Sequence, residues 1–283
     1  MTSVGEKIEA LEKGAVAVIG IPLDENSSYL RGAALGPPRI REALHSGSSN
    51  MMTESGTDLK KVSGWVDVGD MELPRGNHAF QEIERIISGI LSHEVRVLSL
   101  GGDHSITYPI IKAYVRKFRP LTIMQIDAHP DTYDVYEVNR LSHACPFARI
   151  MEEGLADRLV QIGVRTINPH QREQARRFGI EVIEMKDWPS EIRPALKGPV
   201  YLSLDLDGLD PAFAPGVSHH EPGGLSTREV LRIVQALPRE LVGADIVEFN
   251  PSRDSVGITA MVAAKFYKEF VGLMLGPMPA QKS

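Results

Sequence analysis

Short apolar segments rich in valine, isoleucine and leucine recur along the chain, and each ends in glycine or a polar residue. Their apolar content is continuous rather than alternating, which is typical of strands buried on both faces of a parallel sheet. We therefore predict a central, mostly parallel sheet of about eight strands. The predicted strands begin at Ala15, Trp65, Arg96, Leu121, Leu159, Ile180, Val200 and Val242.

Helical patterns lie between these strands. Isoleucine and leucine from Ile83 to Leu91 recur at the spacing of one buried helix face. Ser226 and Glu229 form a capping box, which predicts a helix start. The alternation of strand and helix predicts one α/β domain over residues 1–283. An open sheet and a closed barrel both satisfy it. We favour the open, doubly wound sheet, with helices on both faces and three αβα layers.

Composition excludes some partners. The 283 residues carry a formal net charge of -6, so no basic excess is available to neutralise nucleic acid. Cys145 is the single cysteine and cannot form an intrachain disulfide. No apolar run approaches the roughly 20 residues that span a bilayer. We therefore predict a cytoplasmic protein that binds neither nucleic acid nor membranes.

Three motifs rich in aspartate and histidine each follow a predicted strand: GGDHS, DAHPD and DLDGLDP. The carboxyl ends of parallel strands line one crevice, so side chains far apart in sequence can meet there. In an extended segment, residues two apart point the same way, which pairs Asp127 with His129 and Asp205 with Asp207. The predicted metal ligands are His104, Asp127, His129, Asp131, Asp205 and Asp207.

This ligand set predicts a centre that holds two divalent ions. One histidine alone is more often an ordinary loop residue, but four buried aspartates side by side need cations to offset their charge. Carboxylates and imidazoles without thiolate suit manganese better than zinc, and also accept magnesium, cobalt or nickel. Two ions close together turn a bridging water into hydroxide near neutral pH, so we predict a hydrolase.

Two further residues are candidates for the chemistry. A poor leaving group must be protonated as it departs, and His143 is the candidate acid or proton shuttle. A loop histidine bonded to the backbone is the ordinary alternative, and we discount Cys145 as a nucleophile because it stands only two residues away. Glu248 follows the last strand and could present its carboxylate to a cationic substrate, although a salt bridge or a helix cap is also open to it.

The order GGDHS, DAHPD, SLDLDGLDP and EFNP resembles the ureohydrolases, which include arginase, agmatinase and guanidinobutyrase. The likeness extends over nearly the whole chain. GIPLDENSSYLRGAALGPPRIREAL from Gly20 and APGVSHHEPGGLS from Ala214 resemble plant-type arginases and their bacterial relatives in particular. This resemblance implies a manganese enzyme that hydrolyses a small cationic guanidino compound to urea and an amine. It also implies a homo-oligomer, either a trimer or a hexamer.

The resemblance assigns roles residue by residue. It implies that Asp131 also orients the attacking hydroxide, that His143 shuttles protons, and that Glu248 pairs with the substrate guanidinium. Asp127 and Asp205 would each contact both ions. One manganese would be held by His104, Asp127, Asp131 and Asp205, and the other by Asp127, His129, Asp205 and Asp207.

The substrate is less constrained than the metals. Plant-type arginases act on arginine, which is our first expectation, followed by agmatine and then guanidinobutyrate. Asn168 stands where animal-type arginases have an aspartate, and His219 with His220 replaces a commoner Thr-Pro pair. The candidate contacts to the end of the substrate remote from the guanidinium are Asn139, Ser142, Asn168 and His219, with Tyr136, Arg140 and Glu221 as alternatives.

Two other classes compete with this interpretation. Metal-dependent deacetylases have a similar fold but use one zinc ion, and the paired aspartate motifs here favour two ions. A catalytically silent relative could serve as a metal-binding regulatory subunit, but such proteins typically lose a ligand or the shuttle histidine. All six ligands, His143 and Glu248 are present in this chain.

Overall fold

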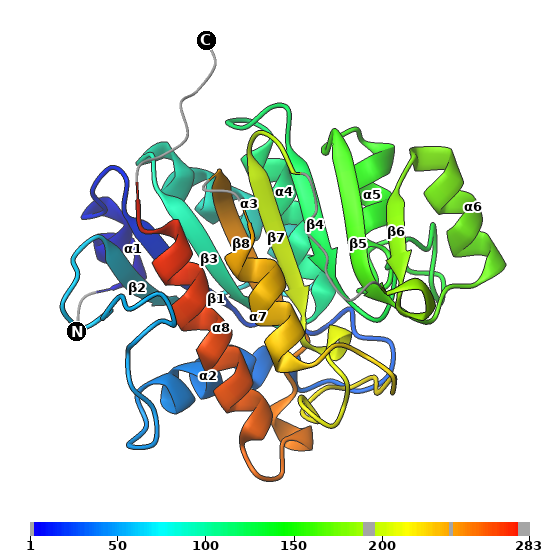
Figure 1. Cartoon of the computed structure of the whole chain (residues 1–283). Helices are drawn as coiled ribbons and strands as arrows, with labels where there is room; N and C mark the ends of the chain where they lie inside the picture. Colours follow the sequence, from blue (N-terminus) through cyan, green and yellow to red (C-terminus); the bar gives the residue numbers. More distant parts are fainter. Residues whose placement is uncertain (1–2, 189–195, 238–239, 277–283) are drawn as a thin grey trace.

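The computed structural model describes residues 3–188, 196–237 and 240–276, and contains one eight-stranded sheet (Figure 1). The strands lie in the order β2-β1-β3-β8-β7-β4-β5-β6, and every neighbouring pair is parallel. All eight predicted strands are confirmed. They are β1 Val16–Ile21, β2 Trp65–Asp70, β3 Arg96–Gly101, β4 Thr122–Ile126, β5 Arg158–Val164, β6 Glu181–Glu184, β7 Val200–Asp205 and β8 Leu241–Val247.

The central strands are buried on both faces because successive side chains point into two different cores. Leu98 and Leu100 of β3 belong to one core, whereas the adjacent Val97 belongs to the other. The same division separates Leu202 from Tyr201 in β7. Period-two geometry and cover on both faces together explain why these strands are apolar without alternation.

Helices cover each face, as the three-layer prediction requires (Figure 1). One core takes in side chains of the first group of helices below, and the other core takes in the second group. The first group is α2 Gly36–Leu44, α7 Thr227–Gln235 and α8 Ile258–Met274. The second group is α1 Val4–Glu9, α3 His78–Ser92, α4 Thr107–Tyr114, α5 Pro146–Glu152 and α6 Pro169–Phe178.

Local sequence signals locate several of these helices. The isoleucine-rich pattern lies inside α3, whose Ile83, Ile87 and Ile90 are fully buried. The predicted capping box is present at α7, where Ser226 accepts from the backbone N–H of Glu229. Among the helices of the described chain, none combines the length and the apolar character needed to cross a membrane.

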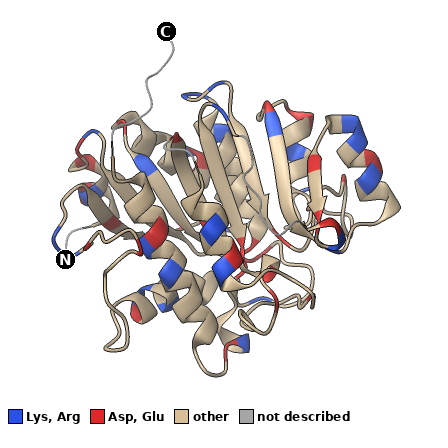
Figure 2. Ribbon diagram, in the orientation of Figure 1, with Lys and Arg blue, Asp and Glu red and all other residues tan. Residues whose placement is uncertain are grey.

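The strands all point the same way, so their carboxyl ends form one edge of the sheet. Short 3-10 helices follow four of the strands there: η2 His104–Ile106, η3 Met185–Asp187, η4 Leu206–Gly208 and η5 Pro251–Arg253. Another, η1 Ala33–Leu35, directly precedes α2. Acidic residues lie where β4 and β7 end, while lysines and arginines are scattered over helices and outer loops (Figure 2). This edge is where the predicted ligands come together.

Candidate active site

The six predicted ligands converge in two groups at the carboxyl edge of the sheet. Ile126 of β4 pairs with Leu204 of β7, so the aspartates that follow these two residues come out side by side. Asp205 is the last residue of β7, and η2 begins at His104 just after β3. The first group is His104, Asp127, Asp131 and Asp205, and the second is Asp127, His129 and Asp207.

The first group surrounds one nitrogen atom of His104. Its Nδ1 lies 3.1 Å from Oδ2 of each of three aspartates: Asp127, Asp131 and Asp205. The imidazole is fully buried, and Nδ1 has no hydrogen-bond partner within the described part of the chain. A buried lone pair facing three carboxylate oxygens is an unsatisfied arrangement in protein alone, and a divalent cation among these atoms would satisfy it.

The second group shares a ligand with the first. His129 Nδ1 lies 3.0 Å from Asp207 Oδ2 and 3.5 Å from Asp127 Oδ1. Asp127 therefore turns one oxygen toward each group, as a bridging ligand would. The distances place Asp205 in the first group, so its implied contact with both ions stays a prediction.

Burial makes the carboxylates of this centre costly without a cation. Burial, followed by the charge of Asp127, raises the pKa of Asp131 to about 6. Burial and then the charge of Asp207 raise the pKa of Asp205. A bound cation would keep these groups ionised. The donors are four carboxylates and two imidazoles, a set that fits manganese, so the residues present suit a two-ion centre.

A chain of hydrogen bonds behind His104 selects the tautomer that a metal requires. Ser203 Oγ donates to Asp245 Oδ1 at 2.7 Å, so the 2.9 Å contact between His104 Nε2 and Ser203 Oγ is a bond donated by the imidazole. This assignment leaves the lone pair on Nδ1. Tyr201 and Thr107 each donate to the other oxygen of Asp245 at 2.9 Å. Outer partners of this kind orient ligands and raise their basicity.

The hydrogen bonds behind His104 were not predicted from the sequence. Gln125 was not predicted either, and its side-chain amide donates to Asp127 Oδ2 at 2.6 Å. The sequence of the strands did contain an indication of both. Gln125, Ser203 and Asp245 are polar residues inside otherwise apolar runs, and all three are fully buried. A polar residue in such a run needs a buried partner, which is a reason to look for a site nearby.

Two site residues adopt backbone conformations that side chains rarely take. Asp131 has φ 50° and Glu248 has φ 63°, both in the left-handed region. Conformations of this kind cost of order 1–3 kcal/mol each and persist where surrounding contacts hold them. Asp131 O accepts from Phe147 N, and Glu248 N donates to Gly102 O. In these strained backbone conformations, the carboxylates of Asp131 and Glu248 both line the pocket.

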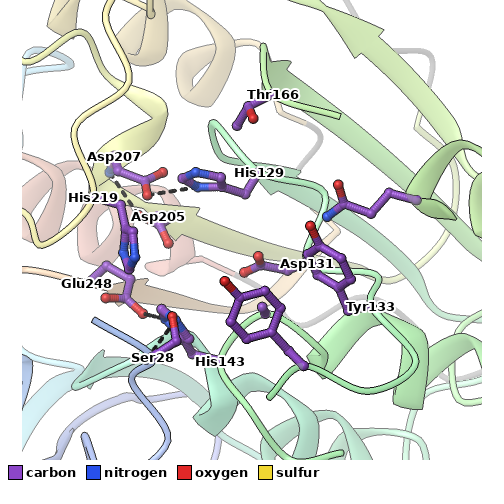
Figure 3. A pocket seen from close by; sticks show the side chains of 13 residues that line it. Ser28, His129, Asp131, Tyr133, His143, Thr166, Asp205, Asp207, His219 and Glu248 are labelled. Atoms are coloured by element: carbon purple, nitrogen blue, oxygen red, sulfur yellow. Dashed lines mark hydrogen bonds and ion pairs between the residues drawn. The ribbon is translucent and has the colours of Figure 1, made fainter. Parts of the chain in front are cut away.

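His143 is held between a carboxylate and a serine (Figure 3). Its Nδ1 lies 2.8 Å from Glu248 Oε1, and its Nε2 lies 2.8 Å from Ser28 Oγ. Burial disfavours the charged imidazole, but the charge and hydrogen bond of Glu248, together with the charges of Asp103 and Asp131, outweigh burial and raise the pKa of His143 to about 9. Glu248 also accepts from the backbone N–H of His104 at 2.9 Å. The predicted shuttle and the predicted guanidinium partner are thus directly bonded.

A pocket with an empty volume of about 590 Å³, open space at its mouth included, exposes these groups. Among the predicted contacts to the remote end of the substrate, His219 and Tyr136 lie on its wall. The His219 ring centroid lies 5.3 Å from that of His143 (Figure 3). The lining residues that sequence reasoning did not single out are Ser28, Tyr133, Ala144, Thr166 and Gln171.

The other predicted contacts are not among the lining residues. Asn139 donates its side-chain amide to Asn26 Oδ1 at 3.3 Å, and Ser142 Oγ lies 3.5 Å from Asn26 O. Asn168 is the N-cap of α6 and donates to the Tyr133 hydroxyl at 2.6 Å.

The charged alternatives lie off the wall as well. Arg140 pairs with Asp134 and Glu152, and Glu221 supplies its backbone oxygen to Arg165. The Arg140 side chain is therefore used in loop structure, whereas Glu221 takes part through its backbone.

Comparison with known proteins gives consistent matches over this fold. The model of the arginase family matches residues 14–272. "Arginase 1, mitochondrial" of Arabidopsis thaliana is 48% identical over 94% of this chain and 83% of its own length. An agmatinase of Bacillus cereus is 33% identical over 93% of this chain and 92% of its own.

A solved structure of arginase from Medicago truncatula superposes with a TM-score of 0.87 at 41% identity. The match covers 96% of this chain and 91% of that one. The fold is therefore shared with the Medicago truncatula arginase over most of both chains.

Proposed function

The chain belongs to the arginase family, and from this premise we propose that it hydrolyses L-arginine to L-ornithine and urea. The observation that carries the proposal is the two adjoining ligand groups, joined by Asp127, beside the His143–Glu248 pair in one pocket. Plant arginases 44% to 48% identical to this chain support arginine as the substrate.

The six residues would hold two manganese ions, with Asp127 common to both ligand groups. When bound, two such ions would supply a hydroxide nucleophile near neutral pH and stabilise developing negative charge. The oxygen-rich donor set supports manganese over zinc. Ser203 and Asp245 keep His104 in the tautomer that leaves Nδ1 free to bind. Asp131 is strained into the pocket, where its carboxylate can accept a hydrogen bond from the nucleophile.

The remaining residues act on the guanidinium and on the proton. Glu248 presents a buried carboxylate to the pocket, and a planar cationic guanidinium is the substrate group that suits it. His143, charged while paired with Glu248, holds the proton that the departing amine requires. Once its nitrogen is protonated, the leaving group departs as a neutral amine. This is far easier than departure of the unprotonated nitrogen as an anion.

Agmatine is the second candidate. Within the described residues, no lysine or arginine lines the pocket, so a carboxylate at the remote end of the substrate would depend on neutral donors such as Tyr136, Thr166 and Gln171. The 33% identical agmatinase supports the same alternative. Guanidinobutyrate, which also carries a carboxylate, is the third.

The experiment that tests the function is urea release by manganese-loaded protein from arginine, agmatine and 4-guanidinobutyrate in parallel. We expect the highest kcat/KM for arginine. A clear preference for agmatine would reassign the substrate and keep the chemistry, whereas urea from none of the three would refute the proposed activity.

Two predictions concern the setting of the enzyme. We propose a homo-oligomer, which size-exclusion chromatography with light scattering would check against the mass of a 283-residue subunit. We also propose a cytoplasmic location, whereas the names of the plant relatives say mitochondrial. Fractionation of the source cells decides between these compartments.

A further inference from the structure

The contacts of Ser28 lead to an inference about how His143 passes its proton to the substrate. Both ring nitrogens of His143 already contact protein groups: Nδ1 contacts Glu248, and Nε2 accepts from the Ser28 backbone N–H at 3.2 Å and lies 2.8 Å from the Ser28 hydroxyl. The His143 side chain is 10% exposed. When Nε2 carries a proton, the Ser28 hydroxyl oxygen is the one of these two groups that can accept it.

Ser28 itself lines the substrate pocket, together with His143 and Glu248 (Figure 3). Its hydroxyl oxygen can accept a hydrogen bond from one side and donate its own proton to the other. That combination is what a relay between a buried imidazole and a group in the pocket requires. Alanine at this position would keep the backbone N–H beside Nε2 and remove only the relay.

The segment that carries Ser28 is fixed to the metal centre. Asp103 is fully buried and accepts from the backbone N–H of Asn26 at 3.0 Å, and its own N–H donates to Leu23 O at 2.8 Å. Asn26 O in turn accepts from the His143 backbone N–H at 3.1 Å. Ser28 and His143 therefore share one anchor, which preserves their contact.

Close packing at one glycine permits this arrangement. A Cβ atom on Gly102 would lie 1.8 Å from Leu23 O, so a larger residue would push residues 23–28 away from the strand edge. The GGDHS motif thus does more than supply the ligand His104. Its glycine and aspartate place the serine that faces the shuttle histidine.

We propose that Ser28 relays the proton between His143 Nε2 and the departing amine; this rests on the proposed hydrolysis. The N–H bond of His143 breaks as an O–H bond to Ser28 forms, and the original Ser28 O–H bond breaks as the amine gains its N–H. Serine ends unchanged. His143 recovers a proton from the water consumed in hydrolysis, so the cycle balances.

The test compares Ser28→Ala with Ser27→Ala, a matched control whose hydroxyl faces Asp103 at 3.3 Å instead of His143. For Ser28→Ala, we expect two metal ions per subunit, a KM within about threefold of the parent, and a kcat lower by about 10²-fold, the lower end for positioned proton transfer. Ser28→Thr restores most of the kcat, and Ser27→Ala stays within about twofold. Equal losses in Ser27→Ala and Ser28→Ala, or no loss in Ser28→Ala, would overturn the relay.

A double variant separates a relay from a packing effect, and Ser28→Thr keeps the test informative if Ser28→Ala is poorly folded. Because Ser28 acts through His143, we expect His143→Ala with Ser28→Ala to have the same kcat as His143→Ala alone. Additive losses would assign Ser28 a purely structural role. Parent protein that holds two metals yet releases no urea would refute the proposed function instead, so the two failures are distinguishable.

Discussion

The metal end of the site and the mouth of its pocket are built in different ways. At the metal end, ligands lie at or directly after buried strands, and His104 and Asp127 are fully buried. At the mouth, the wall comes mostly from loops, with Gln171 from α6, and Tyr29, which packs against His219, is 69% exposed. At a strand end, the sheet fixes the direction in which a side chain points. A loop side chain can instead form hydrogen bonds with any of several neighbours.

This contrast shows where a sequence motif is enough to locate a functional residue. Each ligand motif at the metal end reaches its position through the register of parallel strands, so residue type and spacing carry the information. At the mouth, Asn139 and Asn168 have the chemistry to bind a substrate but are bonded to other residues of the chain. Changes at the metal end should therefore have larger effects than changes farther toward the mouth.

The largest expected effect follows from Asp127→Ala. This change removes the ligand shared by both groups, so we expect fewer than two manganese ions per folded subunit and turnover lower by at least about 10³-fold, since metal-ion stabilisation is worth several kcal/mol. Metal analysis and urea release measure both. Asp210→Asn, in the DLDGLDP motif but outside the ligand groups, should keep its metals. Full metal content in Asp127→Ala would remove it from the ligand set.

His143→Ala tests the border between the two regions. We expect the variant to keep its metals and lose about 10² to 10⁴-fold in kcat, because the positioned proton donor is gone. His170→Ala is the control, since that ring stacks on Tyr133 and does not contact His143 in the described structure. An unchanged kcat for His143→Ala would exclude a shuttle role.

Ser203→Ala tests whether the hydrogen bond that orients His104 contributes to metal affinity. Loss of the bond to His104 Nε2 frees the imidazole to take the wrong tautomer, and we expect manganese affinity to fall by about 10 to 100-fold. Metal titration by calorimetry provides the measurement. Ser88→Ala, a serine of α3 outside both ligand groups, is the control and should bind manganese normally. Equal manganese affinity in both variants would show that the hydrogen bonds from His104 through Ser203 to Asp245 are dispensable for metal binding.

The smallest expected effect is on stability against pH. The pKa of His143 is raised from 6.5 to about 9 by Glu248, so its pairing contributes fully below pH 6.5 and is lost as pH rises through 9. For metal-free protein, we expect the free energy of unfolding to fall by about 1 to 3 kcal/mol across this range. Urea unfolding at pH 6 and 9.5 measures it. His143→Gln should lack this component, and an equal fall in both proteins would assign it to other groups.

Much of the fold could be predicted because the relevant information is local. Apolar runs predicted the eight strands, and the pattern around Ile87 predicted α3. The clustering of the candidate ligands was predictable for the same reason: strand direction and a two-residue spacing bring Asp127 and Asp205 to one edge. The hydrogen bond between Ser203 and Asp245 was not predicted, because the two residues lie on different strands. In the sequence, each is a single polar residue within an apolar segment.

The parallel sheet, the edge where the motifs meet and the six candidate ligands can all be inferred from the amino-acid sequence. They follow from side-chain periodicity and from chemistry carried by short segments. The bond between Glu248 and His143, the position of Ser28 beside the same ring and the role of Asn168 as a helix cap instead become apparent in the folded chain. Such choices depend on which of several nearby partners a buried polar group meets, and that is settled when distant segments pack together.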